Sequence, residues 1–445
     1  MPTGAAPAQS ENPAVDMRDP AFRTDPHALL RELRSRGPVA RDVLGIWLIF
    51  GHADTSTGLR SSHLSREPWR MPVYAKLRPF IADSTLERTT EQWMLFNDPP
   101  KHTRLRRLVN GAFKPPVIEA LRERIAAVTE ELLGALPRAA EFDLMAGVAQ
   151  ALPVRVICDV LGLPTQDFAQ TKAWSDALAW IVEPVVRKEQ RIAANQAAEG
   201  MVAYLRNHIA KRRTGPKRDD LLGLLIAAHD EDAAAHEETH GRPKVPHPPR
   251  GAAATPPGGT LSEDELLGNL ILLFIAGHET TTNLIGNGML SLLRHPQELQ
   301  RLRKQPELMH SAVDEMLRFE GSVTTVSRHT TQPYSVGDTV IPGNETLFFM
   351  LGAANRDPAV FENPERFDIT RAPNPHLGFG AGIHYCLGAP LARLEAEIVF
   401  TKLLQRYPSL ALADTTPAWR KLINLRGLEE LRLNPATPLV HATTP

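Results

Sequence analysis

The sequence predicts a mainly α-helical protein with small β-sheets, and two observations support that fold class. Apolar residues recur at spacings of three and four over long segments, such as 117–136 and 201–209, as they do on one face of a helix. Segments with the aromatic and β-branched content of strands are few, short and interrupted by glycine and proline: 46–50, 334–341 and 346–350. We therefore expect a helical body with minor sheets.

Two segments are expected to be irregular. Residues 1–16 are small and polar, which is typical of a disordered terminus. Residues 236–260 are dense in proline and glycine, which predicts an extended inserted loop or linker, and this composition is equally compatible with a domain boundary. Directly afterwards, Ser262 and Glu265 form a capping-box pattern that predicts the start of a long apolar helix.

Composition and charge exclude several classes of protein. The hydrophobic share of 42% and the charged share of 23% argue against a disordered or fibrous chain. A net charge of −1 gives no sign of a nucleic-acid or membrane partner. The longest apolar run, 270–276, is far shorter than the ~20 residues that cross a bilayer, and the N-terminus lacks a signal-peptide pattern. We therefore expect a cytoplasmic location.

The two cysteines, Cys158 and Cys386, exclude a disulfide framework and a four-cysteine metal site. Cys158 lies in the helical run VRVICDVLG and is expected to be structural. Cys386 lies in HLGFGAGIHYCLGAPLARLEAE, residues 376–397, a loop that leads into a helix. A thiolate at a helix start is stabilised by free N–H groups and by the positive end of the helix dipole, so Cys386 is a candidate metal ligand.

The glycines of this loop allow the backbone to approach a flat cofactor closely. The fixed positions of the motif are Phe379, Gly382, Cys386 and Gly388. A phosphate-binding or dinucleotide-binding loop does not fit, because the third glycine of that fingerprint would fall on Tyr385.

The segment AGHETTTN, residues 276–283, places glycine and polar residues in the middle of the long helix, where they are unexpected. Ala276, Gly277 and Thr280 share one face, which leaves room for a planar cofactor and a diatomic ligand. The Thr280 hydroxyl can donate to the carbonyl of Ala276 and loosen the helix locally. A threonine-rich patch on a surface helix is the alternative interpretation.

Together these segments resemble the cytochrome P450 family, and further family motifs follow in the same order from about Pro26 to Leu433. The resemblance implies a single domain over residues 17–445, with a long central helix over the haem and residues 236–260 as an insertion. It implies haem b (iron protoporphyrin IX) with Cys386 as the sulfur ligand of the iron. It also implies that Glu279 and Thr280 form the acid–alcohol pair that delivers protons during oxygen activation.

The same resemblance assigns supporting charges. Four residues match the family's positions for binding the haem propionates: His102, Arg106, Arg328 and His384. Glu315 and Arg318, three apart on one helical face, match a structural pair that an arginine of a downstream segment joins. We expect that arginine to be Arg366, with Arg371 as the less favoured choice. A solvated surface pair is the alternative.

The activity implied by the resemblance is insertion of one atom of O₂ into a small, largely apolar organic substrate, by hydroxylation or epoxidation. The family's pocket positions are matched by Leu273, Ala276, Thr280, Thr324, Val326 and Leu425. Electrons are expected from a separate ferredoxin and ferredoxin reductase, for which Lys101, Arg104 and Arg107 form a candidate docking patch; a plain solvated face is the equally weighted alternative. The rival interpretations are a peroxide-driven peroxygenase and a non-catalytic haem or gas-binding protein.

Overall fold

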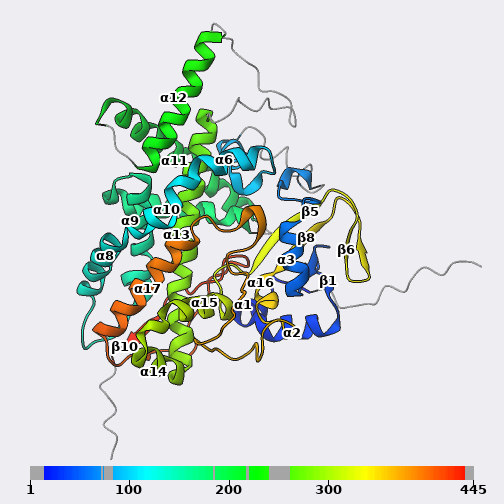
Figure 1. The fold of residues 1–445 in the computed structure, drawn as a ribbon, viewed down its shortest axis with the longest axis vertical. Helices are drawn as coiled ribbons and strands as arrows, with labels where there is room; N and C mark the ends of the chain where they lie inside the picture. Colours follow the sequence, from blue (N-terminus) through cyan, green and yellow to red (C-terminus); the bar gives the residue numbers. More distant parts are fainter. Residues whose placement is uncertain are drawn as a thin grey trace, which may run out of the picture.

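The computed structural model describes residues 15–71, 74, 84–183, 186–216, 220–239 and 261–435. Helices make up most of this part of the chain; β1, β5, β6 and β8 lie on one side of it, whereas β10 lies near α14 and α17 (Figure 1). The longer helices are α2 (Pro26–Arg36), α3 (His52–Arg60), α6 (Lys101–Asn110), α8 (Arg122–Ala135), α9 (Ala151–Leu161), α10 (Phe168–Ala179), α11 (Lys188–Thr214), α12 (Leu221–Thr239), α13 (Glu263–Arg294), α14 (Pro296–Lys304), α15 (Met309–Phe319) and α17 (Ala389–Arg406). The shorter ones are α1 (Pro20–Thr24), α5 (Thr85–Thr90), α7 (Pro115–Glu119) and α16 (Leu351–Ala354).

Single turns of tighter or wider helix connect these elements. The 3₁₀ turns are η1 (Pro68–Arg70), η3 (Met94–Phe96), η4 (Gly111–Phe113), η6 (Thr165–Asp167), η7 (Trp180–Val182), η8 (Pro306–Leu308) and η9 (Gly382–His384), and η5 (Met145–Ala149) is a π-helical turn. The helix expected over 117–136 is broken at Ala120 and Leu121, which separate α7 from α8.

Three sheets contain the strands. The five-stranded sheet has the order β1 (Val39–Arg41), β2 (Trp47–Ile49), β8 (Thr346–Met350), β5 (Thr325–Thr330), β3 (Leu64–Ser65), and only its β2–β8 pair is parallel. The others are β4 (Phe142–Asp143), β10 (Arg432–Asn434), β9 (Ala411–Leu412), and the hairpin of β6 (Tyr334–Val336) and β7 (Thr339–Ile341). The expected strands at 46–50, 334–341 and 346–350 are therefore confirmed. β8 is the central strand of its sheet, and its last four residues are all buried, which explains their continuous apolar character.

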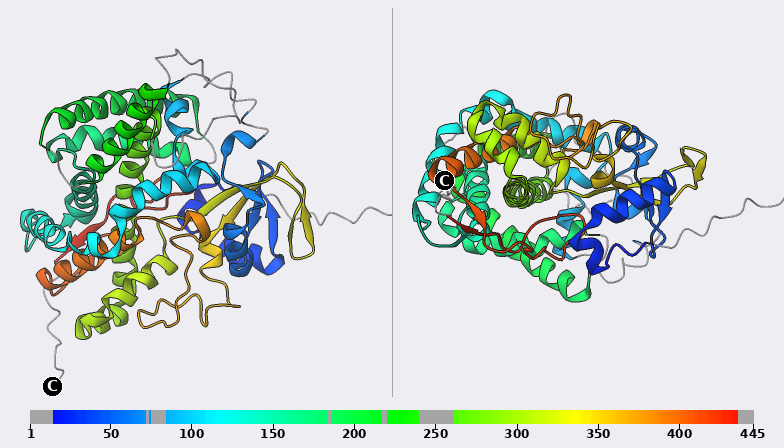
Figure 2. Two further views of the ribbon diagram at one scale, coloured as in Figure 1. Left: turned by 45° about the horizontal axis from the view of Figure 1, so that its top comes forward. Right: turned by 90° about the horizontal axis from the view of Figure 1, so that it is seen from below.

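Helix α13 is the axis of the helical body. It lies in the middle of the molecule when the structure is seen from below (Figure 2, right) and packs against α5, α9, α10, α15 and α17. Its capping box is formed as expected, because Ser262 N–H donates to Glu265 Oε2 and Glu265 N–H donates to Ser262 Oγ. From Glu265 to Leu292 every residue is buried except Ala276, Gly277 and Thr280.

The boundaries of the expected irregular segments need two corrections. Val15 belongs to the segment 1–16 but is buried and bridges to Asp42, so order begins before residue 17. Helix α12 continues to Thr239, over the first residues of the expected loop 236–260. The rest of both segments lies outside the described residues. Within the described part of the chain, no helix has the length and apolarity that spanning a bilayer requires.

Candidate active site

The cysteine loop runs from His376 into the start of α17. Its N-terminal and C-terminal ends are tied together by the Cys386 N–H, which donates to the Phe379 carbonyl at 2.9 Å. Gly382 has a φ of +71°, and a Cβ on it would lie 2.6 Å from the carbonyl oxygen of Leu59 in α3. Packing against α3 therefore requires glycine at 382, and the expected approach of this residue to a cofactor stays a prediction.

Gly388 is the N-cap of α17, and no atom lies within 4 Å of the place where its Cβ would be. Open space thus adjoins the loop beside Cys386, whose side chain is partly accessible. Burial raises the pKa of the Cys386 thiol, although the Gly388 N–H and the Arg106 charge oppose that shift. A metal cation bound to the sulfur would oppose the effect of burial and stabilise the thiolate.

A second ion-pair system holds the loop from outside. Asp314 of α15 accepts from Arg393 Nε at 2.8 Å and lies 3.3 Å from His376 Nε2. The Arg393 guanidinium also stacks on the Phe379 ring, with 4.6 Å to the ring centroid. Phe379 thus contacts the core and Arg393, and its expected contact with a cofactor stays a prediction. Burial opposes ionisation of Asp314, but His376 and Arg393 outweigh it and lower its pKa to about 2.

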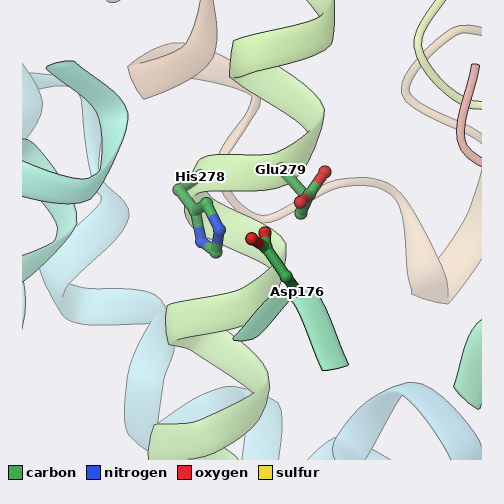
Figure 3. Close-up of side chains that lie close together, drawn as sticks. All are labelled: Asp176, His278 and Glu279. Atoms are coloured by element: carbon green, nitrogen blue, oxygen red, sulfur yellow. The ribbon is translucent and has the colours of Figure 1, made fainter. Parts of the chain in front are cut away.

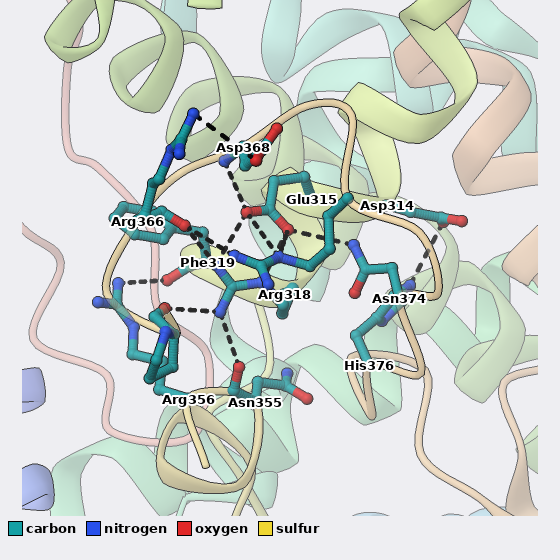
Figure 4. Close-up of polar contacts among 12 residues, drawn as sticks. Asp314, Glu315, Arg318, Phe319, Asn355, Arg356, Arg366, Asp368, Asn374 and His376 are labelled. Carbon is teal, nitrogen blue, oxygen red and sulfur yellow. Dashed lines mark hydrogen bonds and ion pairs between the residues drawn. The ribbon is translucent and has the colours of Figure 1, made fainter. Parts of the chain in front are cut away.

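The expected pair of Glu315 and Arg318 is formed and fully buried. Arg318 donates to both carboxylate oxygens of Glu315, at 2.7 and 2.8 Å (Figure 4). The joining arginine is Arg371, whose Nε lies 3.2 Å from Glu315 Oε2. Arg366 was the wrong choice, because its side chain is 58% exposed and turns to Asp368. Only the backbone carbonyl of Arg366 takes part, as an acceptor for Arg318.

Sequence reasoning missed two further contacts of this network. The Asn374 side-chain amide donates to Glu315 Oε2 at 3.1 Å, and the Asp368 backbone N–H donates to Oε1 at 2.8 Å. Both donors belong to an irregular segment whose path no periodic pattern indicates. Glu315 therefore collects donors from α15 and from the segment that leads to the cysteine loop, and it positions one against the other.

The accessible stretch of α13 is centred on Ala276 and Thr280. The Thr280 hydroxyl donates to the Ala276 carbonyl at 3.1 Å, as expected, and Ser322 Oγ donates to the Thr280 carbonyl at 2.7 Å. Gly277 is partly exposed, and a Cβ there would lie 2.7 Å from the Ile157 side chain of α9. Its small size therefore serves helix packing, and its expected contact with a cofactor stays a prediction.

Glu279 is buried, and its Oε2 accepts from Arg420 Nη1 at 2.5 Å. Burial opposes its ionisation, but the Arg420 guanidinium outweighs burial and holds the pKa of Glu279 below its ordinary value. His278 and Asp176 lie close to the Glu279 carboxylate (Figure 3). Lys172 Nζ donates to the Asp176 carboxylate. Glu279, the expected acid, is therefore present as a carboxylate that pairs with Arg420 within a polar cluster.

His102 of α6 and His384 of the cysteine loop lie together, with ring centroids 4.2 Å apart. Burial lowers the pKa of His102 to about 4 and that of His384 to about 2, with nearby arginines adding to the effect. His102 Nδ1 and His384 Nε2 are buried and have no hydrogen-bond partner in the structure. Two neutral imidazoles with free ring nitrogens thus converge between α6 and the loop.

Two guanidiniums adjoin these rings: Arg328 is buried and Arg66 is partly buried. Arg328 of β5 donates to the Ser327 carbonyl at 2.9 Å, and Arg66, which follows β3, donates to the Ser327 hydroxyl. Burial lowers the pKa of Arg328 to about 10, and burial together with Arg328 lowers that of Arg66 to about 9. Neither side chain pairs with a carboxylate among the described residues. The nearby Asp98 accepts from the Ser65 hydroxyl and the Arg66 backbone N–H.

Buried cations without anions are costly, so this cluster fits a ligand that carries two carboxylates. The propionates of a haem supply such charges, and the residues present therefore fit that cofactor. Arg66 was missed by sequence reasoning, because only the antiparallel β3–β5 pairing brings it to Arg328.

Arg106 differs from the other expected propionate ligands. Its Nη1 and Nη2 donate to the carbonyls of Ile383 and Tyr385 at 2.9 and 2.7 Å. It therefore clamps the cysteine loop to α6. Arg106 also lies near His102 and His384 and lowers the pKa values of both. Its expected contact with a haem propionate stays a prediction.

The expected pocket residues lie on segments that meet near Thr280. Leu425 bridges through its backbone to Val323, and the Thr324 hydroxyl donates to the Ile423 carbonyl at 2.5 Å. Leu273 is buried in the main core, and Val326 is partly buried above the five-stranded sheet. Their contact with a substrate stays a prediction.

The candidate docking patch on α6 is wrong for two of its three residues. Arg104 is buried and forms an ion pair with Glu265 of α13. Lys101 Nζ is held by Gln92 and by the Glu91 carbonyl, at 2.7 and 3.1 Å. Only Arg107 is exposed. The helical pattern could not predict this, because it does not show that α12 and the start of α13 pack against one side of α6.

Comparisons with known proteins identify the family. The family model described as Cytochrome P450 matches residues 73–422. The chain belongs to the cytochrome P450 family. It is 38% identical to Cytochrome P450 107B1 of Saccharopolyspora erythraea, over 94% of this chain and 96% of the relative. It is 34% identical to 6-deoxyerythronolide B hydroxylase of the same organism, with 94% and 97% covered.

Among solved structures, the chain resembles P450BioI in complex with an acyl carrier protein that bears hexadec-9Z-enoic acid. The TM-score is 0.81 at 33% identity, with 93% of this chain and 99% of that chain covered. The protein is thus a haem-thiolate monooxygenase of the P450 fold, an oxidoreductase whose haem iron takes a cysteine sulfur. Members of the family use O₂ and a redox partner.

Proposed function

We propose that this P450 hydroxylates or epoxidises a largely apolar organic substrate, with haem b as the cofactor and Cys386 as the ligand of the iron. The observation that carries the proposal is the interruption of burial on α13. Ala276, Gly277 and Thr280 are accessible in the middle of a stretch of α13 that is otherwise buried, and the open space by Gly388 adjoins the cysteine loop. We also propose a single domain over residues 17–445 and a cytoplasmic location.

The names of two relatives support a largely apolar substrate. One relative is named for hydroxylating 6-deoxyerythronolide B, and P450BioI was solved with a fatty acyl chain on a carrier protein. Both ligands are mainly aliphatic. Leu273, Val326 and Leu425 are apolar and lie on the segments around Thr280, which supports a substrate with exposed C–H bonds and few charges.

The bound haem supplies the oxygen chemistry, which the thiolate sulfur of Cys386 favours by donating electron density. The carboxylates of the haem would be held by Arg66, Arg328, His102 and His384. Thr280 presents a hydroxyl at the accessible face, where it can give or take a proton. Glu279 can take part only after its carboxylate leaves Arg420 or exchanges a proton through intervening water.

The two electrons are proposed to come from a separate ferredoxin and its reductase. Turnover of a candidate substrate with a surrogate ferredoxin system tests this, because product that requires the reductant supports the monooxygenase. Product formed at the same rate with hydrogen peroxide alone would instead indicate a peroxygenase. A screen of hydrophobic ligands, with the spin-state shift of the iron as the readout, supplies the substrate for that test.

The cofactor assignment has its own test. In Cys386→Ser, the thiolate-type red shift of the reduced carbon monoxide complex should be lost, whereas Cys158→Ser should retain it because Cys158 is buried in α9. A red-shifted band that persists in Cys386→Ser would refute the assignment of the ligand.

A further inference from the structure

A cluster of metal-binding side chains lies between α13 and α10. His278 and Glu279 come from α13, and Asp176 comes from α10 (Figure 3). One ligand atom from each of these three residues lies within 4.8 Å of the other two. In Figure 3 the His278 ring turns its edge toward the Asp176 carboxylate, and the Glu279 carboxylate lies just beyond it.

The hydrogen bonds fix what each group presents to the cluster. His278 Nδ1 lies 2.9 Å from the Phe274 carbonyl, which can only accept, so Nδ1 carries the proton and Nε2 presents a lone pair. That Nε2 belongs to a side chain that is 1% exposed, and it has no partner. Asp176 Oδ1 is also buried without a partner.

The basic neighbours occupy the other oxygens. Lys172 Nζ donates to Asp176 Oδ2 at 2.6 Å, and Arg420 Nη1 donates to Glu279 Oε2 at 2.5 Å. Among the described residues, His278 Nε2 and Asp176 Oδ1 are therefore left without a donor. One proton can bridge only two of the three groups, either the two carboxyls or His278 Nε2 and Asp176, and it leaves the third group out. A cation placed among the three satisfies all of them.

The ligand set indicates which cation. One neutral imidazole and two carboxylates suit a zinc-like transition metal, since Mg²⁺ and Ca²⁺ prefer six or more oxygen ligands. The bond from Nδ1–H to a backbone carbonyl is the outer contact that metal-binding histidines usually make. A cavity of about 370 Å³, lined by His278, Glu279 and Gln150 among others, gives an ion access and leaves room for a water ligand.

We propose that Asp176, His278 and Glu279 form a binding site for Zn²⁺ or a similar divalent transition metal. Lys172 and Arg420 already balance the two carboxylates, so binding is weaker than at a structural zinc site and reversible. Bound zinc holds the Glu279 carboxylate away from the Thr280 face. Zinc therefore inhibits turnover, a consequence that rests on the proposed role of Glu279 in proton delivery.

The test uses the haem-loaded enzyme. After treatment with a chelator, the protein is dialysed to equilibrium against ZnCl₂, and bound zinc is measured by elemental analysis. Wild type should bind one zinc ion in addition to the haem iron. His278→Ala and Asp176→Asn should each bind it at least about 10-fold more weakly. Glu429→Gln is the matched control, because Glu429 lines the same cavity outside the cluster.

The carbon monoxide spectrum shows that each variant has folded around its cofactor. Equal zinc affinity in wild type and both cluster variants, or no zinc bound by wild type, would overturn the site. The inhibition is measured separately, as the effect of ZnCl₂ on product formed by wild type and by Asp176→Asn. An enzyme without turnover would refute the proposed function, yet the dialysis would still decide whether the metal site exists.

Discussion

Arg371 closes the buried network beneath the cysteine loop by placing its Nε 3.2 Å from Glu315 Oε2. The same guanidinium donates to the carbonyl of Glu362 at 2.8 Å, so it joins α15 to the segment before the loop. Glu315 is fully buried, and each donor it loses leaves a desolvated charge less well compensated.

Arg371→Ala should therefore lower the free energy of unfolding by about 1.5–3 kcal/mol, the range for a hydrogen bond to a charged group. Arg366→Ala is the matched control and should change it by less than about 0.5 kcal/mol, because the Arg366 side chain is exposed. Urea unfolding of the haem-loaded protein measures both. A larger loss in Arg366→Ala than in Arg371→Ala would contradict the network.

Arg66→Gln should weaken haem binding by about 10-fold or more, which corresponds to 1.4 kcal/mol. The reason is that the guanidiniums of Arg66 and Arg328 pair with no carboxylate among the described residues, and they match the two propionates in charge. The rate of haem transfer to apomyoglobin measures the loss. Arg107→Gln, an exposed change on α6, should release haem at the wild-type rate, and Arg66→Gln doing the same would remove Arg66 from the cofactor site.

Thr280→Ala should divert reducing equivalents from product to hydrogen peroxide, because the hydroxyl at the accessible face is lost. Thr281→Ala is a neighbouring control, since the Thr281 hydroxyl belongs to a buried side chain directed at the Gly277 carbonyl. The ratio of product formed to reductant consumed is the measurement. Unchanged coupling in Thr280→Ala would exclude a role in proton delivery.

The stability of the cysteine loop should fall in acid. The pKa of Asp314 is lowered from 3.8 to about 2, so its ion pairs stabilise the native state above about pH 4. That contribution, about 2 kcal/mol by linkage, is lost as the pH falls from about 4 to 2.

Asp314→Asn should accordingly lose haem faster at pH 6 and show a flatter dependence on pH below 4. Haem release followed by absorbance between pH 6 and 3 measures this, with Asp338→Asn in the exposed turn of the β6–β7 hairpin as the control. A wild-type slope that survives in Asp314→Asn would assign the acid sensitivity to other carboxylates.

Local signals in the sequence account for the parts of this site that lie close together along the chain. The Thr280 back-bond, the capping box of α13 and the Glu315–Arg318 pair all join residues three or four apart, so helical spacing predicts them. Arg66 was not predicted and Arg371 was only the less favoured choice, because their partners lie far away in the sequence and are reached through strand pairing or an irregular segment.

Burial is the other quantity that sequence patterns could not supply. The pattern of α6 suggests surface charges at Lys101 and Arg104, but Arg104 is buried against Glu265 and Lys101 is partly buried and bonded to Gln92. The sequence suggests space for a cofactor at Gly277 and Gly382, and the structure shows that each also packs closely against a protein neighbour. Residue type indicated that these positions are special, and only the packing of α9 and α3 shows why.

The pairing of β3 with β5 joins two parts of the chain that are more than 250 residues apart, and it leaves two like charges side by side at the junction. In the apoprotein these guanidiniums repel each other, so this seam should open more readily there. Haem binding would then stabilise the contact between β3, from the first half of the chain, and β5, from the second half. Proteolysis near residue 66 should accordingly report whether haem has been loaded.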